Sequence, residues 1–79
     1  MQIHEDHLLI VKAVPNGEVS MEIVMGSQAG WYLGTVSRTS DGFLMPYSRD
    51  TDYMHKEEAM AYWKYDYEPT TTDNEQEQE

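Results

Sequence analysis

The chain has 79 residues, no cysteine and a formal net charge of −10 at pH 7. This length allows one domain with a thin core, which disulfides cannot stabilise. Fifteen acids against five bases are unsuited to direct binding of nucleic acid or an anionic membrane, because phosphate contacts depend on Lys and Arg. We expect a cytoplasmic protein, since no apolar run approaches the roughly 18 residues of a membrane span and the first residues lack signal-peptide features.

The N-terminal part of the sequence predicts a β-hairpin. Residues 1–6 are polar and are expected to be loose, whereas residues 7–14 are rich in β-branched and apolar side chains, as a strand is. Asn16-Gly17 then favours a tight type I′ turn. Residues 18–25 alternate apolar and polar side chains, which is typical of a half-buried return strand. Pairing of these two strands is therefore predicted.

Two further strands follow. Residues 31–38 are rich in aromatic and β-branched side chains and predict the third strand. Asp41-Gly42 predicts a second tight turn, and residues 43–45 begin a short fourth strand. Pro46 cannot donate to a strand ladder, so the fourth strand is expected at the edge of the sheet.

One helix is predicted, over residues 54–65. Its early acids, Glu57 and Glu58, suit the positive end of the helix dipole, and His55 imitates a capping residue three positions before Glu58. Three of its side chains share the face that can cover the sheet: Ala59, Tyr62 and Trp63.

The expected fold class is α+β, with an antiparallel sheet of three to four strands and one C-terminal helix packed on it. Residues 1–68 form this single domain, and Trp63 and Phe43 are expected in its core. Residues 69–79 hold nothing apolar beyond Pro69, so we expect a disordered acidic tail.

Motifs for metal binding and catalysis are weak. His4 and His7 could hold a divalent metal on a helix, but in a strand they would face opposite sides. Asp50-Thr51-Asp52 resembles the start of a calcium loop that lacks its glycine and closing glutamate. The sequence has no cysteine nucleophile, Gly-x-Ser-x-Gly motif or phosphate-binding glycine loop. We therefore expect no catalysis, no cofactor and no metal; a small metal-binding protein is kept as a third hypothesis.

The charge points to a protein partner. Residues 50–79 hold ten acids and two bases, and spaced carboxylates can occupy Arg and Lys sites that normally hold phosphates. Tyrosine adds contact area at low entropy cost. The expected partner-binding residues combine the acids near the helix with neighbouring aromatic side chains: Trp31, Asp50, Asp52, Glu57, Glu58, Tyr65, Asp66, Tyr67 and Glu68.

In length, acidity, lack of cysteine and its few strands with one helix, the sequence resembles the small acidic inhibitors encoded by phages, especially anti-CRISPR proteins and other DNA mimics. Local patterns similar to small phage proteins are Trp31-x-x-Gly34-x-Val36, Asp41-Gly42-Phe43 and Lys56-Glu57-Glu58-Ala59. The resemblance implies a stoichiometric inhibitor that covers a basic nucleic-acid-binding surface of a host defence complex in the host cytoplasm. The alternative is a structural or adaptor module that self-associates as a homodimer through its edge strand or its aromatic surface.

Overall fold

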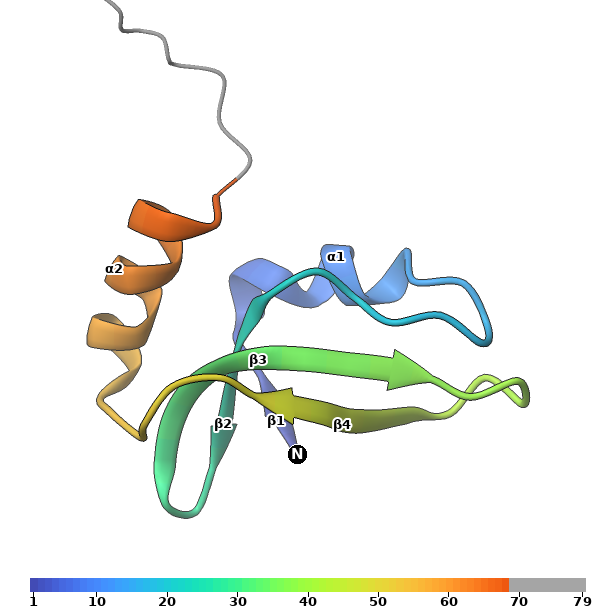
Figure 1. Ribbon diagram of the computed structural model, residues 1–79, viewed down its shortest axis with the longest axis horizontal. Coiled ribbons are helices and arrows are strands. Elements are labelled where there is room, and N and C mark those ends of the chain that lie inside the picture. Colours follow the sequence, from blue (N-terminus) through green and yellow to red (C-terminus); the bar gives the residue numbers. More distant parts are fainter. Residues whose placement is uncertain (69–79) are drawn as a thin grey trace, which may run out of the picture.

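The computed structural model of this protein describes residues 1–68 and has an α+β fold (Figure 1). Four antiparallel strands form one sheet in the order β1-β2-β3-β4. The strands are β1 (Gln2–Ile3), β2 (Ile23–Ser27), β3 (Gly30–Arg38) and β4 (Leu44–Arg49). The helical elements are the short 3-10 helix η1 (Glu5–His7), α1 (Leu8–Lys12) and α2 (Lys56–Asp66). The predicted fold class is confirmed; the predicted tail over residues 69–79 lies outside the described residues.

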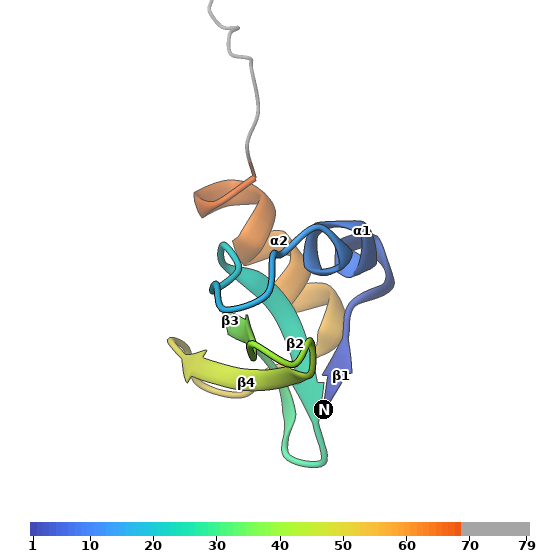
Figure 2. The same cartoon turned by 90° about the vertical axis from the view of Figure 1, so that its right-hand side faces the viewer.

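The long strand β3 organises the molecule. Its first half pairs with β2, and its second half pairs with β4, from Gly34 opposite Arg49 to Arg38 opposite Leu44. Figure 1 shows β3 bending strongly between these two halves, and Figure 2 shows β1 and β4 at opposite edges of the sheet. The sheet therefore has two curved faces, and the apolar side chains on each face must be buried by a different segment of the chain.

Two hydrophobic cores cover these faces, because successive residues of a strand point to opposite sides. One core joins Val11 of the N-terminal segment to residues of β2 and β3: Ile23, Met25, Tyr32 and Val36. The other joins α2 to the opposite face: Val24, Leu33, Ala59 and Trp63. The helix α2 is thus packed on the sheet, as predicted.

The predicted strand over residues 7–14 is wrong. This segment forms the end of η1 and all of α1, and it buries His7 and Val11, which are 1% and 3% exposed. Helical winding brings residues four apart onto one face, and burial of that face overrides the local β-propensity of the segment. The predicted loose start is also wrong, because β1 pairs with β2 and His4 N donates to Val24 O at 3.0 Å.

The predicted hairpin around Asn16-Gly17 is wrong as well. Gly17 has the expected positive φ of 83°, but the segment after it turns to β3 instead of returning along residues 7–14. Val19 bridges Ser37 of β3, and β2 begins only at Ile23. Both parts of the predicted return strand therefore pair with β3, because the intended partner is helical.

The second half of the chain agrees better with the sequence. The predicted third strand is β3, the Asp41-Gly42 turn is present, and Pro46 lies in the edge strand β4. The predicted helix is α2, shifted by one or two residues. His55 is its N-cap without a side-chain capping bond.

The two predicted core aromatics differ in outcome. Trp63 is 4% exposed, so its place in the core is confirmed. Phe43 is 70% exposed, because it lies in the β3–β4 turn beyond the reach of either core. Tyr62 is also exposed, although Ala59 and Trp63 of the same predicted helix face are buried.

Candidate functional site: an acidic groove beside helix α2

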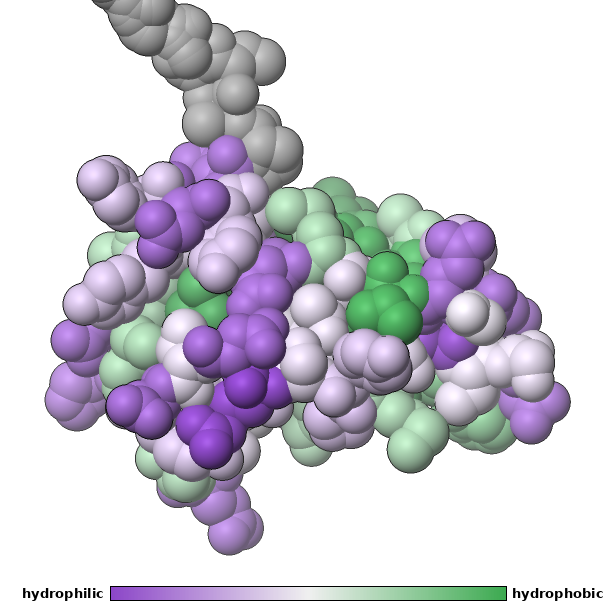
Figure 3. Space-filling view, viewed as in Figure 1, coloured by the Kyte–Doolittle hydropathy of each residue, from purple (hydrophilic) through white to green (hydrophobic). Residues whose placement is uncertain are grey.

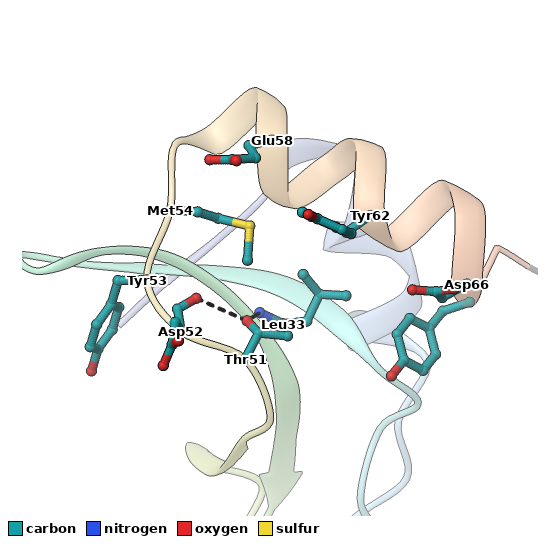
Figure 4. A pocket seen from close by; sticks show the side chains of 9 residues that line it. Leu33, Thr51, Asp52, Tyr53, Met54, Glu58, Tyr62 and Asp66 are labelled. Carbon is teal, nitrogen blue, oxygen red and sulfur yellow. Dashed lines mark hydrogen bonds between the residues drawn. The ribbon is translucent and has the colours of Figure 1, made fainter.

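A groove of about 400 Å³ lies between α2 and the loop that precedes it. We call it the acidic groove. Its lining comes from β3, the loop and the helix (Figure 4): Leu33, Thr51, Asp52, Tyr53, Met54, Glu58, Tyr62, Asp66 and Tyr67. Leu33 and Met54 supply apolar surface, and three of the remaining residues are carboxylates.

Hydrogen bonds to β3 hold the loop wall of the groove. Thr51 Oγ1 accepts from Leu33 N at 3.0 Å, and Asp50 N donates to Leu33 O at 2.8 Å. Met54 and Trp31 exchange two backbone hydrogen bonds, at 2.7 and 2.9 Å. The loop thus continues the pairing of β3 beyond the end of β4, and its side chains stand on a braced backbone.

The side of the groove that α2 forms consists of one row of side chains. Glu58, Tyr62 and Asp66 are each four residues apart, so they form one row along α2. Figure 4 shows this row above Leu33. Tyr62 was instead predicted to lie on the buried face with Ala59 and Trp63. The four-residue spacing of Glu58, Tyr62 and Asp66 is the signal that could have identified the row.

The groove carries negative charge with little compensation. Within the described residues, its lining includes no Lys, Arg or His, and neither Glu58 nor Asp66 forms an ion pair. Asp52 lies 4.0 Å from Arg49, but both side chains are exposed, so this pair contributes little. A cation entering the groove would therefore meet carboxylates that are still free to bind it.

A carboxyl pair that the sequence did not reveal adjoins the groove. Burial, followed by hydrogen bonding to and repulsion from Asp50, raises the pKa of Glu22 to about 7. Within residues 1–68, the buried Glu22 Oε2 has no hydrogen-bond donor. Asp50 is held by Ser48 Oγ, which donates to its Oδ2 at 3.0 Å. The protonated form of Glu22 is therefore favoured at this position.

The pair also acts on Tyr67 at the end of the groove. The charge of Glu22 raises the pKa of the Tyr67 phenol, with smaller contributions from burial, Asp66 and Asp50. Tyr67 therefore stays a neutral hydrogen-bond donor. The pair therefore lies near enough to the groove to act on one of its lining residues.

The predicted partner-binding residues divide into two sets. The groove lining brings together Asp52, Glu58, Asp66 and Tyr67, and Asp50 adjoins them. Glu57 lies elsewhere, in a shallow pocket that it shares with Lys56 and Lys64. Tyr65 is 87% exposed and Glu68 is exposed just after α2, and neither lines the groove.

Trp31, one of the expected partner-binding residues, does not line the groove. It is half-buried: its indole lies against Gly26 and packs on the α2 core, and the Nζ atom of Lys56 is 5.3 Å from the ring centroid. Lys56 in turn pairs with Glu5 at 2.8 Å. Trp31 therefore supports the fold on the side of α2 where Lys56 lies.

The two N-terminal histidines are buried with their rings 5.7 Å apart. Their predicted separation onto opposite faces is wrong, because η1 is helical. Each Nδ1 accepts a backbone hydrogen bond: His4 from Asp6 N at 3.0 Å, and His7 from Val24 N at 2.9 Å. Those nitrogens are occupied by structural bonds, and in the described part of the chain no three potential metal ligands come together.

Comparisons of the chain with family models, curated proteins and solved structures found no match. Among residues 1–68, no helix has the length and apolar character needed to cross a membrane.

Proposed function

We propose that this protein is a non-catalytic binding protein whose acidic groove docks onto a basic surface of a partner protein. The observation that supports this is the groove itself, in which Asp52, Glu58 and Asp66 surround an apolar floor and lack a compensating base among the described lining residues. A guanidinium group suits such a site, because it binds carboxylates through paired hydrogen bonds and stacks on aromatic rings. Tyr62 and Tyr67 provide those rings.

We further propose that the partner is a nucleic-acid-binding protein of a host defence complex and that docking inhibits it, as the resemblance to phage-encoded DNA mimics implies. Surfaces that bind phosphates present clustered Arg and Lys side chains. Carboxylates seated among those side chains would compete with nucleic acid for them. The net charge of −10 favours rapid association with such a surface.

Two neighbouring glutamates provide a matched test. Glu58 lines the groove and Glu57 does not, although both are exposed acids of the first turn of α2. The protein and its Glu58→Lys and Glu57→Lys variants are immobilised, and a bacterial lysate is passed over each at low salt. We expect a nucleic-acid-binding protein to be retained by the wild type and by Glu57→Lys, and to be lost with Glu58→Lys.

The salt dependence and a competition assay complete this test. Retention should weaken as salt is added, and nucleic acid should displace the protein from the captured partner. Equal retention by the two variants would show that the groove is not the docking site. Retention that is indifferent to salt would argue against a basic partner.

Self-association is a second candidate function, and one observation favours it. Residues 7–49 carry three acids and three bases, so this part of the chain has no net charge. It also exposes large apolar side chains that could meet in a homodimer: Leu8, Leu9, Val19, Phe43 and Met45. Sedimentation over a range of protein concentrations tests this directly, and a species that stays monomeric at all of them would eliminate the homodimer.

A further inference from the structure

The acidic groove continues along β3 onto a part of the sheet beyond α2. Leu33, Thr35 and Ser37 share one face of β3, because alternate residues of a strand point to the same side. Leu33 packs beneath α2 and forms the groove floor. Thr35 and Ser37 lie further along the same face and are only partly buried.

An apolar row crosses the far end of this face. Val19 bridges Ser37 on one side, and Met45 of β4 pairs with Ser37 on the other. Side chains directly opposite in antiparallel strands point the same way, about 5 Å apart. Val19 and Met45 therefore flank Ser37, and they are 45% and 52% exposed.

Hydroxyl groups connect the groove to this row. The Oγ1 of Thr35 and the Oγ of Ser48 are hydrogen-bonded at 2.8 Å, and Ser48 Oγ is also 3.0 Å from Asp50 Oδ2. Figure 3 shows hydrophilic side chains crowded beside α2 and hydrophobic ones further along, towards the β3–β4 turn. One strip thus runs from carboxylates through hydroxyls to apolar side chains.

We propose that this whole strip is the docking surface, and that its occupant is a partner segment carrying a basic side chain followed by an apolar one. This inference rests on the proposed function and adds the shape of the partner segment to it. From Leu33 to Ser37 the strip spans about 13 Å, at roughly 3.3 Å per residue. An extended segment with its basic and apolar residues four positions apart matches that length.

The negative charge of the groove and the irregular β4 edge favour this occupant over other ways of covering the sheet. The groove end of the strip is negative, which selects a cation there, while the row end presents the exposed apolar side chains of Val19 and Met45. Strand addition at the β4 edge is disfavoured, because Pro46 lacks an N–H and the β3–β4 register shifts beside it. The segment is therefore expected to lie across the face and not along the edge.

Two synthetic peptides test the proposal. Both are short Gly-Ser peptides with one Arg; the first also has a Leu four positions further on, and the second has Ser there. Each is titrated into the ¹⁵N-labelled protein, and the amide signals are followed by NMR. Both peptides should shift the groove signals of Asp52 and Glu58. Only the Leu peptide should shift those of Val19, Ser37 and Met45, and it should bind about tenfold more tightly.

A double variant provides the control. Val19→Ser with Met45→Ser should bind the two peptides equally and keep the Arg-dependent shifts. Leu9→Ser, which changes a 79% exposed side chain of α1, should retain the preference for Leu. A dispersed amide spectrum shows that each variant is folded.

The possible failures are distinguishable. Arg-dependent binding that is equally strong for both peptides with the wild type would overturn the extended strip and leave the groove intact. Binding of neither peptide would overturn both proposals. Shifts of Val19 and Met45 that depend on protein concentration alone would show that a second copy of the chain occupies the row, which also overturns the proposal.

Discussion

Trp63 Nε1 donates a hydrogen bond to the backbone oxygen of Glu22 at 2.7 Å. This bond ties α2 to the segment just before β2, where the side chain of Glu22 interacts with Asp50. The Trp63 indole also packs on the ring of His7, with centroids 4.1 Å apart. One buried side chain thus holds the N-terminal segment, the helix and the acidic region in a fixed relation.

Replacement of Trp63 by Phe should therefore destabilise the protein by about 1–3 kcal/mol, because the Glu22 carbonyl loses its donor inside the structure. Urea unfolding measures this change. Trp31→Phe is the control, since in the described residues no hydrogen bond involves the Trp31 indole. Equal losses in the two variants would mean that ring volume, and not the hydrogen bond, accounts for the effect.

The stability of the protein should also depend on the protonation of Glu22. The folded pKa is about 7, above the ordinary 4.5, so between these values the folded state holds the proton more strongly than the unfolded state. The resulting stabilisation is complete below about pH 4.5 and is lost as the pH rises through about 7. In Glu22→Gln, urea unfolding should show no such loss. Glu18→Gln, at an exposed site, should behave like the wild type.

His7 should have the opposite dependence. Burial, with a smaller effect of His4, lowers the pKa of His7 below its ordinary 6.5, although Asp6 partly opposes this. The neutral ring is therefore favoured in the folded state. Its contribution is present above pH 6.5 and is lost as the pH falls through the folded pKa. Unfolding of Glu22→Gln isolates this effect, because the carboxyl no longer opposes it.

A second substitution separates His7 from the exposed His55. In the Glu22→Gln background, His7→Gln should flatten the fall in stability on acidification. His55→Gln, at an exposed position before α2, should leave that fall unchanged. A fall that persists unchanged in the His7 variant would assign the acid sensitivity to another group.

Gly34 should not tolerate a side chain. A Cβ at this position would collide with the carbonyl oxygen of Ser48 in β4, and it would also meet the side chain of Met25. Gly34→Ala should cost about 3 kcal/mol in urea unfolding, because the two strands must move apart. Ser37→Ala on the same strand should change stability by no more than about 0.5 kcal/mol. If Gly34→Ala also cost no more than about 0.5 kcal/mol, β4 would have to move away from the new side chain without loss of stability.

The sequence predicted those elements whose signals are local. Strand β3 follows from its aromatic and β-branched composition, the following turn from Asp41-Gly42, and the edge position of β4 from Pro46. Helix α2 follows from its spacing of apolar residues. The N-terminal segment was mispredicted, because burial of His7 and Val11 overrides a local preference for strand.

The candidate site shows the same division. The acids around α2 are visible in the sequence, and the four-residue spacing of Glu58, Tyr62 and Asp66 indicates one row. The contribution of Glu22 was not visible, since its approach to Asp50 depends on how β2, β3 and β4 align. Successive residues of a helix point in different directions, so Glu58 lines the acidic groove and Glu57 does not.

By itself, the sequence determined the fold class, the strong negative charge and the C-terminal helix, because composition and periodicity are properties of neighbouring residues. Only the tertiary structure decided that residues 5–12 are helical, that Trp31 supports the core, and that Glu22 lies beside Asp50. These outcomes depend on which distant segments compete for the two faces of one small sheet, and that competition is settled by burial across the whole fold.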